Sequence, residues 1–482
     1  MLSEAYHLLV LLGTLTLLIW LVVRGLNVLA AAPLCAALAI LCSGHDPLVG
    51  LSGSYMTGLA DYLRRFYLIF TLGAVFGRVM SVSQAGVQVA ELICRGLGRE
   101  RACLAVVLAC AVLSLGGVSL FVVGFTVVPL AIPLFRAADL PRRFIPAAVA
   151  FGSVTFTMTA AGSPAIQNLI PIQYFVDAVT AQPLTDARAG WPVSLIVAVA
   201  MFVVGQWYLD RAIRLDRQRG AKFESRPGDP LSTPTEHSAE SHSPRPSPPP
   251  RPGSLRSLLP LLMTVFALNL LPGLCRRVAA MLPSEGSMQP VQAALRWVPE
   301  DGVFAIFVGL IAAILLLRPW IPDLGHAVGE GFAQGLLAVG STSAMVGFGA
   351  AIQKLHGFQL VVDWVTHLPG HPLLTAALAV ALIAGIAGTA SGGQGIALPI
   401  LKPICIDQMH VSARALHRVV SLSSGTLDTL PANGYLVVLI RHLCGETHGS
   451  AYWPIFITTV IVPTGGTLLA VLLFWLSPGW AV

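Results

Sequence analysis

The sequence predicts an all-α polytopic membrane protein built from two inverted repeats, each with about five transmembrane helices, one re-entrant helical hairpin and a broken helix after the hairpin. Three observations predict this class. Of the 482 residues, 55% are apolar and 11% charged, whereas roughly 25% of the residues of a soluble globular domain are charged. The apolar residues gather in runs of spanning length. The same order of interrupted segments also occurs twice along the chain.

Ten apolar runs have about the length that crosses a bilayer. They lie near 6–24, 27–43, 66–82, 144–175 and 192–209 in the first half, and near 257–275, 303–318, 336–353, 414–440 and 453–476 in the second. The first run lacks the positively charged start of a signal peptide, so we expect it to be a helix of the folded protein.

Two further apolar segments, 101–137 and 373–405, are each divided by a glycine cluster. The clusters read LSLGGVSLFVVG at 113–124 and AGIAGTASGGQG at 384–395. Each half-segment is too short to cross comfortably, so both segments are predicted to be re-entrant helical hairpins with glycines at their tips. Bent backbone at membrane depth survives only where protein or a water-filled cavity satisfies its polar groups.

A proline- and serine-rich stretch at 211–254 separates a first repeat, 1–210, from a second, 255–482. Because it cannot bury a core, we expect a disordered linker. Phe223 is the only aromatic residue among its basic residues, so no nucleic-acid partner is expected. If the linker is cytoplasmic and both termini are outside, 19 of the 29 Lys and Arg residues lie inside, which agrees with the positive-inside rule.

The two halves share their order of parts. In each, a glycine-rich turn precedes two prolines spaced by four, and the pair Pro129 and Pro133 is repeated 270 residues later as Pro399 and Pro403. A helix interrupted by Thr, Ser, Gly, Pro and Asn follows, over 144–175 and over 414–440. Inverted repeats with discontinuous helices in matching positions are typical of secondary transporters, whose sites lie at the breaks.

The runs GGVSLFVVGFTVVPLAIPLF, GSVTFTMTAAGSPAIQNLIP and SLSSGTLDTLPANG resemble the gluconate permease family, which belongs to the wider ion transporter superfamily with the dicarboxylate and citrate carriers. The resemblance covers about 50–180 and 330–475. It implies transport of gluconate, hydroxybutyrate or a related acid across a bacterial inner membrane, an elevator-like mechanism and a homodimer through scaffold helices. The chain departs from the family's Gly-Thr-Pro-Gln and Pro-His-Asn turns at 162–165 and 431–433, where it reads Gly-Ser-Pro-Ala and Pro-Ala-Asn.

The substrate site is expected where the two tips and the two breaks present helix N-termini, glycines and hydroxyls, since uncapped amides and the positive dipole end attract a carboxylate. For any one residue a purely structural role is equally well supported, because hydroxyls often bond their own backbone and glycines often serve close packing. If 155–159 is unwound, its three threonines point the same way. The candidates are Gly117, Ser119, Thr155, Thr157, Thr159, Ser163, Asn168, Thr389, Ser391, Gly392, Gly393, Ser424, Thr426, Thr429 and Asn433.

Asp428 is the only carboxylate inside either broken helix. A charged side chain at membrane depth is costly and is by default a functional hypothesis, so we expect Asp428 to carry the coupling proton or to help ligate sodium. The alternative is a structural cap on the helix that restarts near Pro431. Lys402 either neutralises a substrate carboxylate or extends to the membrane interface.

Other polar residues are expected to play structural parts. Four arginines at the feet of the broken helices are predicted to be loop residues that set topology and bind lipid headgroups: Arg142, Arg143, Arg414 and Arg418. His417 and Ser421 share a helix face at the spacing of a base and a nucleophile, but no oxyanion loop or GxSxG motif accompanies them. The eight cysteines show no CxxC spacing, so neither a disulfide framework nor a zinc site is indicated.

These observations predict a secondary active transporter that imports a small hydroxy- or keto-carboxylate by cation symport, with protons favoured over sodium. No enzyme activity, cofactor or resident metal is expected. Within transport, the alternative is a Na⁺-coupled di- or tricarboxylate carrier of the citrate type. Outside transport, the alternatives are an ion channel, which would conduct without uphill accumulation, and a membrane-embedded enzyme, which would need a nucleophile with its base.

Overall fold

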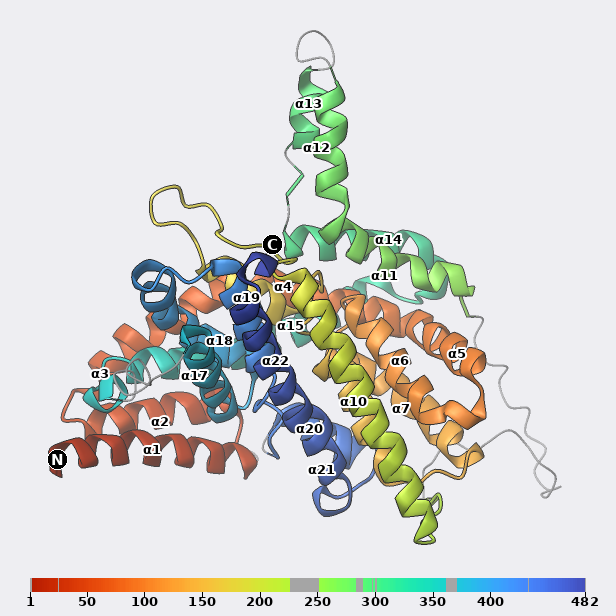
Figure 1. Ribbon diagram of the computed structural model, residues 1–482, viewed down its shortest axis with the longest axis horizontal. Helices are drawn as coiled ribbons and strands as arrows, with labels where there is room; N and C mark the ends of the chain where they lie inside the picture. Colours follow the sequence, from red (N-terminus) through yellow and green to blue (C-terminus); the bar gives the residue numbers. More distant parts are fainter. Residues whose placement is uncertain are drawn as a thin grey trace.

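The computed structural model describes residues 2–24, 26–225, 251–282, 289–296, 298–299, 301–360, 371–431 and 433–481 (Figure 1). Within these residues every regular element is a helix, and one isolated β-bridge joins Val176 to Pro183. The predicted all-α class is confirmed. Residues 226–250 of the predicted linker, and Ala432 in the second break, lie outside the described residues.

The first half of the chain contains ten α-helices and four short helical turns of other types. The α-helices are α1 (Leu2–Val23), α2 (Val28–Cys42), α3 (Pro47–Gly50), α4 (Met56–Val82), α5 (Ala85–Leu97), α6 (Ala102–Leu115), α7 (Leu120–Ala137), α8 (Ile145–Ala150), α9 (Ile166–Tyr174) and α10 (Trp191–Gln218). Two π-helical turns, η1 (Leu51–Tyr55) and η4 (Phe151–Thr155), and two 3₁₀ turns, η2 (Arg99–Arg101) and η3 (Arg142–Phe144), complete it.

The described part of the second half is also helical. Its α-helices are α11 (Ser254–Asn269), α12 (Leu271–Met281), α13 (Gln289–Arg296), α14 (Gly302–Leu317), α15 (Leu324–Ile352), α17 (Pro372–Ala387), α18 (Ala390–Leu401), α19 (Ala413–Ser424), α20 (Gly434–Val437), α21 (His448–Phe456) and α22 (Val462–Leu476). Three π-helical turns, η6 (Lys402–Gln408), η7 (Val438–Leu443) and η8 (Ile457–Ile461), and two 3₁₀ turns, η5 (Arg318–Trp320) and η9 (Pro478–Ala481), lie among them.

Six helical segments in the described residues are long and apolar enough to cross a membrane. They are Pro47–Val82, Leu120–Ala137, Trp191–Gln218, Gly302–Trp320, Leu324–Ile352 and His448–Leu476. Several begin well before the predicted runs; the run at 66–82, for example, is the end of a 36-residue helical segment. The apolar runs at 6–24 and 27–43 form α1 and α2, which pack against each other and, through α2, against α15.

One predicted run is bent, and one predicted hairpin limb is longer than expected. The run at 257–275 is not one straight helix, because the chain bends by 58° between α11 and α12. Pro272 stands in the first turn of α12, where its missing amide costs nothing and its ring prevents continuation of α11. α12 and α13 then project away from the other helices (Figure 1). The second limb of the first hairpin, α7, has 18 residues with a mean hydropathy of 2.0 and is long enough to cross.

The helices α4 and α15 form a close antiparallel pair at the centre of the fold. A β carbon on Gly335 would lie 2.5 Å from Cα of Thr71, and one on Gly331 would lie 2.6 Å from Cα of Val75. The two glycines are spaced by four, so they lie on one face of α15 and let the two backbones touch. Small residues at this spacing are the usual basis of tight helix packing in membranes.

Replacing Gly335 by alanine should therefore destabilise the fold, because the added methyl group meets backbone that cannot move aside. We expect a loss of about 1–3 kcal/mol, the usual cost of overpacking. Gly329 on the same helix is the matched control: nothing lies within 4 Å of its β carbon, and alanine there should be neutral or stabilising by up to about 1 kcal/mol. Thermal unfolding of the purified variants measures the difference, and equal midpoints would refute the packing assignment.

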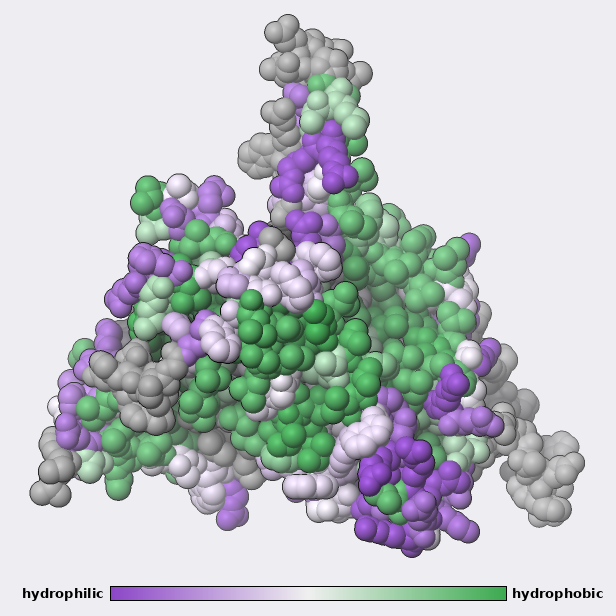
Figure 2. All heavy atoms as spheres, in the orientation of Figure 1, coloured by the Kyte–Doolittle hydropathy of each residue, from purple (hydrophilic) through white to green (hydrophobic). Residues whose placement is uncertain are grey.

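Apolar side chains face outward along the long helices. On α10, four exposed residues recur every fourth position and so form one line: Leu195, Val199, Val203 and Trp207. Figure 2 shows hydrophobic residues over α10 and α22 and hydrophilic residues at the lower end of α10, where Arg211, Arg214, Arg217 and Arg219 are exposed. An apolar stripe that ends in a basic cluster is typical of a helix that leaves the bilayer at that point.

Candidate transport site

The first broken helix is interrupted over residues 156–165, between η4 and α9. The unwound backbone is tied to its surroundings: the Gly162 amide donates to the Ala187 carbonyl at 2.8 Å, and the Asn269 side chain donates to the Gly162 carbonyl at 2.9 Å. The segment before α10 and the end of α11 thus supply the partners that a continuous helix would supply itself.

The three threonines at the start of this break, Thr155, Thr157 and Thr159, do not share a direction. The Thr157 hydroxyl donates to the Ser153 carbonyl at 2.8 Å, and that of Thr159 makes a longer contact of 3.5 Å with the Thr155 carbonyl. Bonds to the carbonyl four residues earlier are a helical pattern, so the condition under which the three threonines would point the same way is not met. Thr155 instead reaches another element, donating to the Thr458 carbonyl at 3.0 Å.

Two further candidates stabilise the break locally. The Ser163 hydroxyl accepts from the Ala165 amide at 3.2 Å. The Asn168 side-chain amide donates to the carbonyls of Ser163 and Ala187, both at 2.9 Å. Both residues are buried, and Oδ1 of Asn168 has no hydrogen-bond partner among the described residues. Asn168 therefore holds the break in shape and keeps one acceptor available.

The tip of the first hairpin is the turn from Gly116 to Ser119, between α6 and α7. Gly117 has φ of +91°, a conformation that favours glycine, and a β carbon there would lie 3.3 Å from Cγ of Pro164. The tip thus lies against the first break. Ser119 is the N-cap residue of α7, but its side chain makes no capping hydrogen bond.

The tip of the second hairpin is shorter than the predicted Thr389–Gly395. It consists of Gly388, with φ of +62°, and Thr389, the N-cap residue of α18. Three candidates therefore lie within the first turn of α18 and not at the tip: Ser391, Gly392 and Gly393. The Gly393 amide already donates to the Thr389 carbonyl, and a β carbon there would meet Cα of Ala384 at 2.5 Å, so this glycine serves close packing of α17 on α18.

The second broken helix is interrupted over 425–433, between α19 and α20. Ser424 and Thr426 donate to the carbonyls three residues earlier, at 2.8 and 2.7 Å. Thr429 donates to the Thr459 hydroxyl at 2.8 Å. The Thr389 and Ser391 hydroxyls lie 3.1 Å apart. Most candidate hydroxyls thus form hydrogen bonds within the protein. For each of these residues taken alone, this agrees with the structural role.

Asp428 lies where the second break meets the second hairpin. Its side chain is buried, faces the backbone amide of Ala390 at the start of α18, and has an Oδ1 atom without a hydrogen-bond partner among the described residues. The helix that restarts after the break is capped by Asn433, whose Oδ1 accepts from the Leu436 amide. Asp428 is therefore not the cap on that helix; it sits at the positive end of α18, which favours a negative charge.

The two breaks lie next to each other. A β carbon at Gly425 would be 3.6 Å from Cγ2 of Thr159. Both breaks also bond the same π-helical turn, η8, since Thr155 donates to Thr458 and Thr429 donates to Thr459. π-helical turns concentrate at functional sites. The residues predicted as two half-sites are thus parts of one region, with each hairpin tip against its own break.

A buried polar cluster that sequence reasoning missed joins α9, α18 and α19. The Gln394 side-chain amide donates to the Gln167 carbonyl at 3.0 Å and to the Ser424 hydroxyl at 2.9 Å. The Ser421 hydroxyl donates to the same Gln167 carbonyl at 3.1 Å. The side-chain oxygens of both glutamines have no partner among the described residues. The sequence feature that could have indicated this cluster is Gln394, a polar residue within an apolar hairpin limb.

The prediction that Arg418 is a loop or lipid anchor is wrong. Its side chain is fully buried, and its guanidinium donates to three backbone carbonyls: Nη1 to Thr159 at 2.6 Å, Nε to Ala189 at 2.9 Å and Nη2 to Ala187 at 3.3 Å. One side chain of the second broken helix thus binds the first break and the segment before α10. These contacts of Arg418 could not be predicted from the sequence, because arginines at loop ends usually lie at the membrane interface.

The remaining charged candidates have partners. Arg142 is also buried, and its Nε donates to the Cys444 carbonyl at 3.0 Å. Lys402 forms an ion pair with Asp407 at 2.9 Å. His417 and Ser421 do not pair with each other: Nδ1 of His417 is 2.8 Å from the Thr185 hydroxyl, while Ser421 donates to a carbonyl. His417 and Ser421 therefore do not form the base and nucleophile pair that their spacing would allow.

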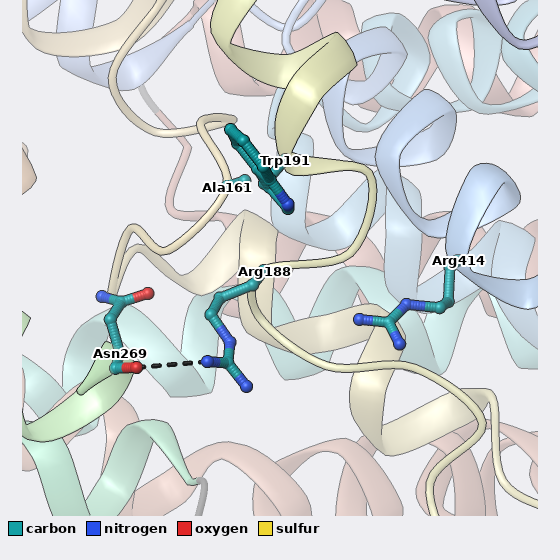
Figure 3. Close-up of a pocket in the computed structure, with 5 residues that line it drawn as sticks. All are labelled: Ala161, Arg188, Trp191, Asn269 and Arg414. Atoms are coloured by element: carbon teal, nitrogen blue, oxygen red, sulfur yellow. Dashed lines mark hydrogen bonds between the residues drawn. The ribbon is translucent and has the colours of Figure 1, made fainter. Parts of the chain in front are cut away.

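A pocket of about 490 Å³ opens beside the first break. It is lined by Ala161, Arg188, Trp191, Asn269 and Arg414, as Figure 3 shows. The lining comes from the break, the start of α10, the end of α11 and the start of α19. Among the described residues, no group of three or more His, Cys, Asp or Glu side chains is placed to hold a metal ion.

Comparisons with known proteins agree with this picture. Residues 6–208 match the family profile described as GntP family permease. The uncharacterized transporter YxjC of Bacillus subtilis (strain 168) is 34% identical over 471 residues, covering 94% of this chain and 96% of that protein. The crystal structure of the Alcanivorax borkumensis YdaH transporter shares the fold, with a TM-score of 0.56, 17% identity and 91% of each chain covered. The chain is a membrane transporter that belongs to the GntP family of permeases.

Proposed function

We propose that this protein is a secondary active transporter that imports a small organic acid anion, such as gluconate, hydroxybutyrate or a related hydroxy- or keto-carboxylate, by cation symport. The observation that carries the proposal is the meeting of two broken helices in a buried polar region with a single carboxylate, Asp428. Broken helices offer amides to an anion and carbonyls or hydroxyls to a cation, and they are costly to maintain at membrane depth without a function.

The two halves are proposed to be inverted repeats, and the order of elements supports this. In the first half α6 and α7 form a hairpin that precedes the interrupted α8, η4 and α9; in the second, α17 and α18 precede the interrupted α19 and α20. In an elevator-like mechanism the hairpins and breaks move as one unit against a scaffold, for which the tightly packed α4 and α15 are the best candidates. We further propose a homodimer in a bacterial inner membrane, with the linker cytoplasmic and both termini outside.

Protons are proposed as the coupling ion, with Asp428 as the carrier. Its buried carboxyl, with an oxygen that no described residue bonds, is able to bind and release a proton without dismantling a hydrogen-bond network. The threonine hydroxyls of both breaks donate to carbonyls or to one another, which leaves their oxygen lone pairs able to ligate a cation. The Na⁺-coupled alternative is therefore kept and is separated from proton coupling by the gradient experiment that follows.

Uptake by proteoliposomes tests the proposal. A panel of labelled sugar acids, hydroxybutyrates and dicarboxylates is first narrowed by thermal-shift screening, since a ligand of the folded state raises its apparent stability. We expect an inward pH gradient to drive saturable accumulation of at least one acid above its external concentration, and a sodium gradient at equal pH to drive none. Sodium-driven uptake would identify the citrate-type alternative, and flux without saturation or accumulation would identify a channel.

A further inference from the structure

The pocket beside the first break is lined by two cationic side chains and by no carboxylate among the described residues. Arg188 comes from the segment before α10 and Arg414 from the first turn of α19; in Figure 3 they extend toward the same space from opposite sides. Trp191 forms an apolar wall, and the Asn269 side-chain amide donates to the Gly162 and Val265 carbonyls. This combination of convergent polar groups and an aromatic wall, in a volume of about 490 Å³, is typical of small-ligand pockets.

Both guanidinium groups are held by contacts with neighbouring residues. Nη1 of Arg188 donates to the Asn269 carbonyl at 3.2 Å. Nη2 of Arg414 donates to Asp186 at 2.7 Å, and the second oxygen of that carboxylate accepts from the Arg188 amide at 2.8 Å. A guanidinium has five N–H donors, and the contact with Asp186 uses only part of the capacity of Arg414. The groups are thereby oriented in advance, which lowers the entropic cost of binding an anion.

The backbone reinforces the charge. α10 begins at Trp191, and its N-cap residue, Gly190, has no side chain to satisfy the first amides. The positive end of a 28-residue helix therefore lies at the pocket wall. Arg418, one turn after Arg414 on α19, is buried behind the same wall, where it bonds Ala187 and Ala189 on either side of Arg188.

The pocket also has a defined place relative to the membrane. α10 has 28 residues and is roughly 42 Å long at 1.5 Å per residue, so it is long enough to cross a bilayer. The pocket lies at its first residue, while its last turns carry the exposed basic cluster that leads to the linker. If α10 spans the membrane, the pocket and the linker are on opposite faces, and the pocket adjoins the first break through Ala161.

We propose that this pocket is a capture site for small organic carboxylates at the extracytoplasmic mouth of the transport path. Arg188 and Arg414 bind the carboxylate, as planar guanidinium groups do well, and Trp191 packs against the carbon chain. The direction of access rests on the proposed function and on the cytoplasmic linker. The binding of a carboxylate in the pocket depends on neither of these, and it is tested separately.

The test places a thiol in the pocket by the substitution Ala161→Cys. The full-length variant is reconstituted in vesicles of zwitterionic lipid, and an anionic sulfonate thiol reagent and a cationic trimethylammonium thiol reagent are added in parallel. Labelling of the unsubstituted chain, which has its own cysteines, is subtracted. We expect the anionic reagent to react faster, and millimolar gluconate or citrate to slow its reaction, because these anions occupy the pocket.

Removing the two arginine charges should reduce the preference for the anionic reagent. With Arg188→Gln and Arg414→Gln together, the ratio of anionic to cationic labelling rates should fall by roughly tenfold, as expected for two charges that line the same pocket as the thiol in partly screened water. Arg211→Gln, which removes one exposed charge at the opposite end of α10, is the matched control and should leave the ratio unchanged. If the double Gln variant does not fold, lysine at both positions should keep the ratio but lose protection by gluconate and citrate.

Three results would overturn the proposal: a ratio unaffected by the double substitution, labelling that neither acid slows, or protection only when the vesicles contain phosphatidylglycerol. The last would assign the arginines to a lipid phosphate. Because labelling needs no transport, the outcome is independent of the proposed function. A chain that takes up no acid in proteoliposomes, yet shows both the preference and the protection, would refute the transport proposal and retain the carboxylate site.

Discussion

Replacing Arg418 by methionine should reduce uptake to the level of protein-free liposomes and lower the stability of the purified protein. Methionine fills much of the same volume but donates no hydrogen bond. The Ala187 carbonyl keeps its bonds from the Gly162 amide and the Asn168 side chain, whereas the carbonyls of Thr159 and Ala189 lose the donor that the guanidinium provides. Two buried carbonyls left unpaired at about 1–3 kcal/mol each cost about 2–6 kcal/mol.

The loss of uptake follows from the position of these carbonyls. Thr159 is in the first break beside Gly425 of the second, so releasing it disorders the point where the two broken helices meet. Thermal unfolding and proteoliposome uptake measure the two effects. Arg418→Lys separates charge from geometry: an ammonium retains the charge but cannot direct donors to three separate carbonyls, and we expect intermediate stability with uptake still strongly reduced.

Arg211→Met is the control for the loss of an arginine, because Arg211 is exposed at the far end of α10. It should change neither quantity. The assignment of Arg418 as the residue that holds the first break would be wrong if Arg418→Met unfolded at the same temperature as the unsubstituted protein, or if the lysine variant transported normally.

The role of Arg418 is a feature of the site that could not be predicted from the sequence. Run lengths and clusters of glycine and proline depend on local chemistry, and the structure has helix ends at those clusters. Whether an arginine at the start of a helix meets lipid or protein depends on what packs over it, and for Arg418 that is the segment 187–189, some 230 residues earlier. No local pattern carries that information.

The positions of the two breaks followed from the sequence more fully than the contacts of single residues did. Its two breaks meet through Thr159 and Gly425. The roles of single residues differ, because hydroxyls expected to face a ligand bond carbonyls, and Gly393 serves packing. Gln167 and Gln394 were overlooked for the opposite reason: their significance comes from the contact between α9 and α18, which only the folded chain reveals.

The substitution Asp428→Asn should abolish accumulation driven by a pH gradient while the protein remains folded. Asparagine has nearly the same shape, and its carbonyl oxygen is still able to face the Ala390 amide, so the contact with α18 persists. What it loses is the ability to take up and release a proton. We therefore expect the variant to exchange labelled for unlabelled substrate across the membrane but not to concentrate it, whereas the unsubstituted protein should do both.

Asp407→Asn is the matched control, because Asp407 is a carboxylate of the same half that is half-exposed and paired with Lys402. It should leave both accumulation and exchange intact, since a solvated ion pair contributes little. Exchange in the Asp428 variant shows that the substrate site and its movement survive, so loss of accumulation then reports on coupling alone. If Asp428→Asn still concentrates substrate with an unchanged dependence on the pH gradient, the coupling proton travels by another group, and Asp428 serves only the start of α18.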